Sequence, residues 1–173
     1  MDFFEVVERR QSIRAYVAKE IEQAKVERIL SALCLGPSAG NLQVFLVIVV
    51  REQQKKQQLD EAAYGRGFIA EAPIVLAFLA DQHRSETKYG TRGVALFSIQ
   101  DATIAAAYTE LAATALGIAS CWVGAFDEEH VRTALGAPAH LRPVTLMPLG
   151  YAAVSPIRRQ RRSLGELVRH NKV

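Results

Sequence analysis

Residue types and patterns that mark several common protein classes are scarce in this 173-residue chain. It has only two cysteines, Cys34 and Cys121, far apart in apolar surroundings, which argues against a disulfide-rich scaffold and predicts two buried free thiols. Its longest apolar run covers residues 44–50, far short of the roughly 20 residues of a membrane-spanning helix. The acidic start, Met-Asp-Phe-Phe-Glu, is unlike a secretion signal. We therefore expect a cytoplasmic protein that does not cross a membrane.

Fingerprints of the common nucleotide, metal and hydrolase sites are missing too. No Gly-x-Gly-x-x-Gly follows an expected strand, and neither a P-loop nor a Gly-x-Ser-x-Gly motif occurs. The four histidines, at positions 83, 130, 140 and 170, have no partner at metal-ligand spacing. These absences argue against a dinucleotide-binding domain, a P-loop NTPase, an α/β-hydrolase and a metal site.

What the chain does contain is an ordinary globular composition with an uneven distribution of positive charge. Half of its residues are hydrophobic and 23% are charged, which fits one domain spanning residues 1–173. The net charge is only +3, but basic residues gather in "ERRQSIR" (8–14) and "IRRQRR" (157–162). This asymmetry predicts an anionic partner, which from charge alone could be a small ligand or nucleic acid.

Apolar periodicity and turn residues predict an alternation of helices and strands. A first helix, capped by Asp2 and Glu5 and ending near Arg9 or Arg10, is expected to have a buried side made of Phe3, Phe4, Val6 and Val7. Further helices are expected over 22–35, 52–63, 96–116 and 127–135, and strands over 44–50, 72–80, 118–123 and 144–149. The run 44–50 is apolar on both faces, as in an interior strand. Residues 81–93 have no apolar period and predict a long loop that forms a lid or pocket wall.

The expected architecture follows from the order of these elements. The helix over 96–116 is apolar nearly all round, which places it at the centre of a core or at a subunit interface. Strands separated by helices, with one such central helix, predict a mixed sheet sandwiched by helices. The C-terminal tail, about residues 152–173, is polar and basic and has no core pattern, so it needs another surface on which to lie.

Three short stretches could carry chemistry. Arg10, Ser12 and Arg14 alternate, so in an extended segment their side chains point the same way and could hold a phosphate, although a solvated basic turn is an alternative. The stretch "PSAGNLQ" (37–43) is small and polar, and a plain helix-to-strand turn would explain it. In "SCWVGAFD" (120–127), Gly124 directly follows an expected strand and would let a backbone amide approach a planar ligand.

Together these stretches resemble the nitroreductase family of FMN-dependent oxidoreductases. The matching pieces are "DFFEVVERRQSIRAY", "GPSAGNLQVFLVIVV", "EAPIVLAF", "ALGIASCWVGAFD", and "LGY" followed by "RRQRRSLGELV", in the order of the family and over nearly the whole chain. The resemblance implies an α+β fold, a nitroreductase-like three-layer α/β/α sandwich with a mixed, mainly antiparallel central sheet and a long buried central helix. It also implies an intertwined homodimer with FMN at the interface and the C-terminal tail packed on the partner subunit.

The resemblance also implies roles for individual residues. Arg10 and Ser12 would face the FMN phosphate, Arg14 the pyrimidine edge of the flavin, and the backbone of Gly124 the flavin N5, with no catalytic side chain. The full set of implied cofactor-binding residues is Arg10, Gln11, Ser12, Arg14, Pro37, Ser38, Ala39, Asn41, Val123, Gly124, Arg159 and Arg161. Of these, Pro37, Ser38 and Ala39 would reach the flavin of the partner subunit.

The implied activity is hydride transfer from NAD(P)H through flavin N5 to a flat acceptor such as a nitroaromatic or a quinone, with no metal, nucleic acid or membrane involved. Residues 81–93, with Arg84, Tyr89 and Arg92, are where we expect the acceptor to be selected. Two alternatives stay open at this point: other flavin chemistry on the same fold, such as flavin cleavage or reductive dehalogenation, and a basic non-enzymatic module that binds nucleic acid.

Overall fold

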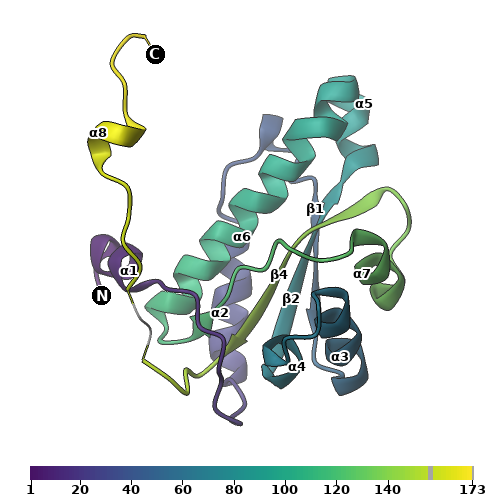
Figure 1. The fold of residues 1–173 in the computed structure, drawn as a ribbon. Coiled ribbons are helices and arrows are strands. Elements are labelled where there is room, and N and C mark those ends of the chain that lie inside the picture. The colour runs from purple at the N-terminus through teal and green to yellow at the C-terminus, as the bar shows by residue number, and fades with distance from the viewer. Residues whose placement is uncertain (156–157, 173) are drawn as a thin grey trace.

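A computed structural model describes residues 1–155 and 158–172 of the chain (Figure 1). Its centre is a four-stranded sheet in the order β1-β2-β4-β3, in which every neighbouring pair is antiparallel. The strands are β1 (Phe45–Val50), β2 (Ile74–Asp81), β3 (Ala119–Ser120) and β4 (Leu141–Gly150). A parallel bridge between Ser12 and Ser120 adds the segment after the first helix to the β3 edge. The sheet is therefore mixed and mainly antiparallel, as expected.

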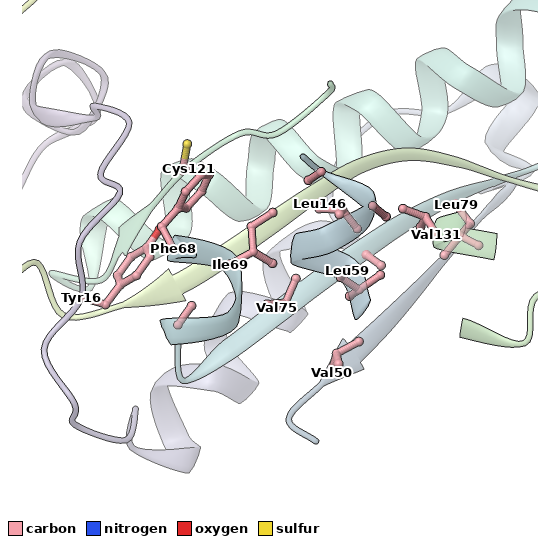
Figure 2. Close-up of a cluster of buried hydrophobic side chains, with 14 of the residues drawn as sticks. Tyr16, Val50, Leu59, Phe68, Ile69, Val75, Leu79, Cys121, Val131 and Leu146 are labelled. Carbon is pink, nitrogen blue, oxygen red and sulfur yellow. The ribbon is translucent and has the colours of Figure 1, made fainter. Parts of the chain in front are cut away.

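Helices cover both faces of this sheet. They are α1 (Phe3–Arg9), α2 (Gln23–Leu33), α3 (Gln53–Ala62), α4 (Phe68–Glu71), α5 (Gln82–Arg92), α6 (Ser98–Ala115), α7 (Glu128–Leu135) and α8 (Leu164–Leu167), with a 3-10 turn, η1 (Ala39–Asn41), and a π-helical turn, η2 (Gly93–Phe97). On one face, α2 and α6 pack on the sheet through residues such as Ile29 and Ala105. On the other face, Leu59, Ile69 and Val131 of α3, α4 and α7 cover the strands (Figure 2). This is the expected three-layer α/β/α sandwich.

The position of β1 differs from the prediction. The sequence indicated an interior strand, but β1 lies at the edge of the sheet and pairs only with β2. Leu46 and Val49 of β1 are 45% and 38% exposed in the single chain, whereas residues 74–80 of β2 are all buried. An apolar run indicates that its side chains favour burial, but it does not determine whether the strand has one or two neighbouring strands in the sheet.

Residues 81–93 form a helix and not the predicted loop. Asp81 caps α5 by accepting a hydrogen bond from the backbone N–H of Arg84 at 2.9 Å. Ser85 is the buried residue of this helix, which explains why no apolar period was visible. Gly90 interrupts α5 with φ 54° and ψ −144°, a conformation that favours glycine, and η2 then leads into α6.

Two predictions of burial are also wrong. The capping box between Asp2 and Glu5 is present and α1 ends at Arg9, but of its apolar residues only Val6 is buried. The apolar side chains Phe3, Phe4 and Val7 are 63%, 76% and 45% exposed. Cys121 is buried as predicted, whereas Cys34, at the end of α2, is exposed. Among the described residues, no helix has both the length and the apolar composition that crossing a membrane would require.

A buried carboxylate joins α3 to α4. Asp60 is 6% exposed and accepts hydrogen bonds from the backbone N–H groups of Gly67 at 2.8 Å and Ile69 at 3.0 Å. Tyr64, Gly65 and Gly67, in the turn between the two helices, have positive φ angles. Two of the three are glycines, which adopt positive φ readily, but the conformation is costly at Tyr64, so the turn depends on contacts that fix it.

Replacing Asp60 with alanine is expected to lower the free energy of unfolding by about 3 kcal/mol, because two N–H groups lose a charged acceptor. Glu61→Ala is the matched control, since Glu61 is the exposed neighbour in the same helix and its loss should change stability by less than about 0.5 kcal/mol. Chemical denaturation of both variants measures the difference, and equal midpoints would contradict this role for Asp60.

Candidate functional site

The segment after α1 runs extended along the edge of the sheet. The backbone N–H of Ile13 donates to the carbonyl of Ser120 at 2.8 Å, and the buried hydroxyl of Tyr16 donates to the carbonyl of Ile13 at 2.7 Å. Ile13 and Tyr16 point into the core, while Ser12 and Arg14 are exposed and Arg10 is partly exposed. The alternation read from the sequence therefore places Arg10, Ser12 and Arg14 on the outer side of one strand-like segment.

These side chains line a cavity of about 640 Å³ that we call the basic cradle. Residues 10–15 form one wall, and Val154, Ser155, Arg159 and Arg161 contribute from the other end of the chain. Four arginines thus meet at one cavity, and no acidic residue is among its described lining residues. A guanidinium binds phosphate through paired N–H donors, so this set of side chains fits a small phosphorylated ligand. The predicted stretch at 157–162 begins at Ile157, which lies outside the described residues.

Glu110 of α6 contacts Arg10, one of the residues that line the basic cradle. Its carboxylate is buried and accepts hydrogen bonds from Arg10 Nη1 and from the hydroxyl of Ser120, both at 3.4 Å. The contact with Arg10 engages Nη1, one of the two terminal nitrogens of its guanidinium. Sequence reasoning missed Glu110, although it is one of two acidic residues in a largely apolar helix, which was a visible signal.

A second, narrower cavity of about 120 Å³ also has Arg14 in its wall, so Arg14 links it to the basic cradle. Its lining residues are Arg14, Ala63, Tyr64, Arg66, Phe68, Cys121, Trp122, Val123, Gly124 and Ala125. Val123 is held by backbone hydrogen bonds with Leu146 in both directions, at 2.9 and 3.0 Å, while Gly124 is exposed. Burial raises the pKa of the Cys121 thiol, which argues against a nucleophilic role. The two cavities together offer a cationic end and an end with several apolar lining residues, which also has Arg14 and Arg66 in its wall.

The loop over residues 37–43 lies elsewhere on the chain. Pro37, Ser38 and Ala39 line a separate cavity of about 480 Å³ with residues of η2 and α6, namely Phe97, Ile99, Gln100, Asp101, Thr103 and Ile104. This cavity has no lining residue in common with the basic cradle or with the second cavity. The structure therefore brings Arg10, Gln11, Ser12, Arg14, Val123, Gly124, Arg159 and Arg161 to one region, and leaves Pro37, Ser38, Ala39 and Asn41 in another.

Comparison with known proteins identifies relatives of the whole domain. The NADH dehydrogenase of Thermus thermophilus is 32% identical, over 84% of this chain and 84% of the relative. The FMN reductase [NAD(P)H] of Bacillus subtilis is 28% identical, over 83% of this chain and 63% of the relative. The crystal structure of a nitroreductase family protein from Streptococcus pneumoniae superposes with a TM-score of 0.89 at 23% identity, over 98% of this chain and 100% of that one, and so shares the fold.

A family model also matches most of the chain. The model described as "Nitroreductase family" matches residues 7–66 and 61–151, which include the N-terminal wall of the basic cradle, the loop over 37–43 and the Val123–Gly124 region. The fold, the order of the elements and the sequence similarity agree. The chain belongs to the nitroreductase family.

Proposed function

We propose that this protein is an FMN-dependent NAD(P)H oxidoreductase that transfers a hydride through flavin N5 to a flat acceptor such as a nitroaromatic or a quinone. The observation that carries the proposal is the meeting of four arginines at one cavity, which Arg14 links to the second cavity beside Val123 and Gly124. Membership of the family supports it, as do relatives that include an FMN reductase.

The residues present offer contacts for the parts of FMN. Arg10, Ser12, Arg159 and Arg161 supply the donors that a terminal phosphate needs, and Val123 and Gly124 line the adjoining second cavity, beside which the ring would lie. Arg14, between the two, would lie at the pyrimidine edge, where a fixed cation favours the anionic reduced ring. When bound, FMN supplies the hydride-carrying ring, and the protein supplies orientation and charge.

The basic residues argue for a small ligand over nucleic acid. Both basic stretches of the sequence contribute to one concave site, whereas a protein that binds nucleic acid non-specifically spreads its cations along a surface that follows the phosphate backbone. The positive charge is then explained by a single phosphate and the nearby ring.

We further propose that each complete site is built from two copies of the chain. The loop over 37–43 lines a cavity that shares no lining residue with the basic cradle, which supports a site whose loop comes from a second copy. The exposed apolar side chains Phe3 and Phe4 of α1, together with Leu164 and Leu167 of the tail, offer a surface that such a partner would cover. In Figure 1 the tail with α8 extends away from the sandwich, in keeping with a tail that packs on a partner.

The acceptor is proposed to be selected by α5 and η2. The rings of Tyr89 and Phe97 pack in a T-shaped arrangement at a centroid distance of 5.1 Å. The guanidinium of Arg92 lies over the ring of Phe97, 5.3 Å from its centroid. Phe97 in turn lines the cavity beside the loop over 37–43. Side chains of α5 therefore border the region where the loop would meet a flavin. On the same helix, Arg84 is exposed and lies one turn before Lys88.

The purified protein is expected to be yellow or to become yellow with added FMN, with an absorption band near that of free flavin. Anaerobic addition of NADH or NADPH should bleach this band, and a nitroaromatic or quinone should restore it. Buffer with the same concentration of free FMN is the control, since it should react far more slowly. A colourless protein that does not take up FMN would refute the proposed function.

A further inference from the structure

We propose that Asp101, a buried residue of α6, is a positioning residue that fixes the loop over 37–43 in the shape that packs on the flavin. The inference rests on the proposed function and goes beyond the family resemblance, which pointed to the loop but not to what holds it. It begins from an unusual placement: Asp101 is 2% exposed and lies beside Ala102, which is fully buried.

The carboxylate of Asp101 holds both ends of the loop. One oxygen accepts a hydrogen bond from the backbone N–H of Ala39 at 2.9 Å, and the other accepts one from the N–H of Val44 at 3.4 Å. Ala39 is 62 residues and Val44 57 residues from Asp101 in the sequence. Buried carboxylate oxygens are costly to leave without donors, so these two contacts tie the loop to the central helix.

The loop needs such an anchor because its backbone is strained. Gly40, Asn41 and Gln43 have φ angles of 56°, 57° and 51°, and two of the three are not glycine. Within the loop, the hydroxyl of Ser38 accepts a hydrogen bond from the N–H of Gln43 at 3.1 Å, an exposed contact that alone holds little. Residues in this conformation persist where the surroundings determine them, and they gather at ligand sites.

Asp101 also lies where a positioning residue should lie. It lines the same cavity of about 480 Å³ as Pro37, Ser38 and Ala39, the part of the loop expected to face the flavin. It belongs to an 18-residue helix packed in the core, so the loop is held by a rigid element. A loop that already has its binding conformation raises affinity, because the entropy cost of ordering the loop does not have to be met when the ligand binds.

The test compares Asp101→Asn with Leu59→Ala. Asparagine keeps the shape of the side chain but replaces one acceptor oxygen with an NH₂ group, which cannot accept the second N–H. Leu59 is fully buried on the other face of the sheet, so its replacement destabilises the protein without touching the loop. Three quantities are measured for each: hydrogen exchange at the amides of Ala39 and Val44 without FMN, the FMN dissociation constant, and the visible spectrum of the bound flavin.

For Asp101→Asn we expect hydrogen exchange at both amides to become about 10-fold faster. The FMN dissociation constant should rise about 10-fold and the flavin absorption band should shift, because losses of this size are typical when a residue that supports a binding site is replaced. Leu59→Ala should lower the melting temperature and leave all three unchanged.

The outcomes separate this inference from the proposed function. If the unchanged protein does not bind FMN, the proposed function fails, and the exchange rates still report whether Asp101 holds the loop. If the unchanged protein binds FMN and Asp101→Asn matches Leu59→Ala in all three measurements, the positioning role of Asp101 is overturned while the proposed function stands. Should Asp101→Asn fail to fold, hydrogen exchange in the unchanged protein decides instead: amides of Ala39 and Val44 that exchange as fast as amides without a hydrogen bond would overturn the role.

Discussion

Deletion of residues 158–173 is expected to leave the sandwich folded while weakening FMN binding at least 100-fold and preventing dimer formation. The described part of this tail is exposed, with Leu164 and Leu167 at 76% and 60%, so its loss removes no core packing. Arg159 and Arg161, however, are half of the arginines at the basic cradle. Two charge-assisted contacts to a phosphate, at about 1.4 kcal/mol or more each, correspond to about 100-fold in affinity.

A full-length variant separates the two effects of this deletion. Arg159→Gln with Arg161→Gln should weaken FMN binding by a similar factor but keep the dimer, because the apolar tail residues remain. Circular dichroism, size-exclusion chromatography with light scattering and flavin fluorescence titration give stability, assembly and affinity for both proteins. A truncated chain that stays dimeric and binds FMN as tightly as the full chain would show that the tail does not contribute to the site.

Replacing Arg14 with alanine is expected to lower the reduction potential of the bound flavin on the order of 40 mV, with a smaller effect on FMN retention. Arg14 lines both cavities, whereas Arg10 lines only the basic cradle. A cation a few ångströms from the reduced ring stabilises the negative charge of that ring. Because Arg14 is exposed to solvent, screening weakens this effect. Arg10→Ala should show the reverse pattern, with FMN affinity falling about 10-fold or more and little change in potential.

The control for these two variants is Arg9→Ala. Arg9 is an exposed arginine in the last turn of α1, next to Arg10 in sequence but outside both cavities, so its loss changes the net charge equally. Spectroscopic titration against a reference dye gives the potential, and fluorescence gives the affinity. The assignment of Arg10 and Arg14 is rejected if both variants behave like Arg9→Ala.

Elements governed by short-range interactions were predictable from the sequence. The capping box of Asp2 and Glu5 and the start of α7 at the Asp127 cap are present as expected, and Gly136 ends α7 in the left-handed conformation. The basic alternation at Arg10, Ser12 and Arg14 also held, because an extended segment places alternate residues on one side. The family resemblance located the remaining candidate residues, whose contacts with a flavin stay a prediction.

The tertiary structure alone decided how distant segments meet. Only the folded chain shows β1 at the edge of the sheet and Glu110 beneath Arg10, 100 residues away in the sequence. It also shows Asp101 bound to both ends of the loop over 37–43. Capping, periodicity and turn preferences act over a few residues, so the sequence by itself determined most of the helices and strands and the basic segment, but not helix α5. Strand order and contacts of buried carboxylates depend on packing between elements far apart in the chain, which no local pattern encodes.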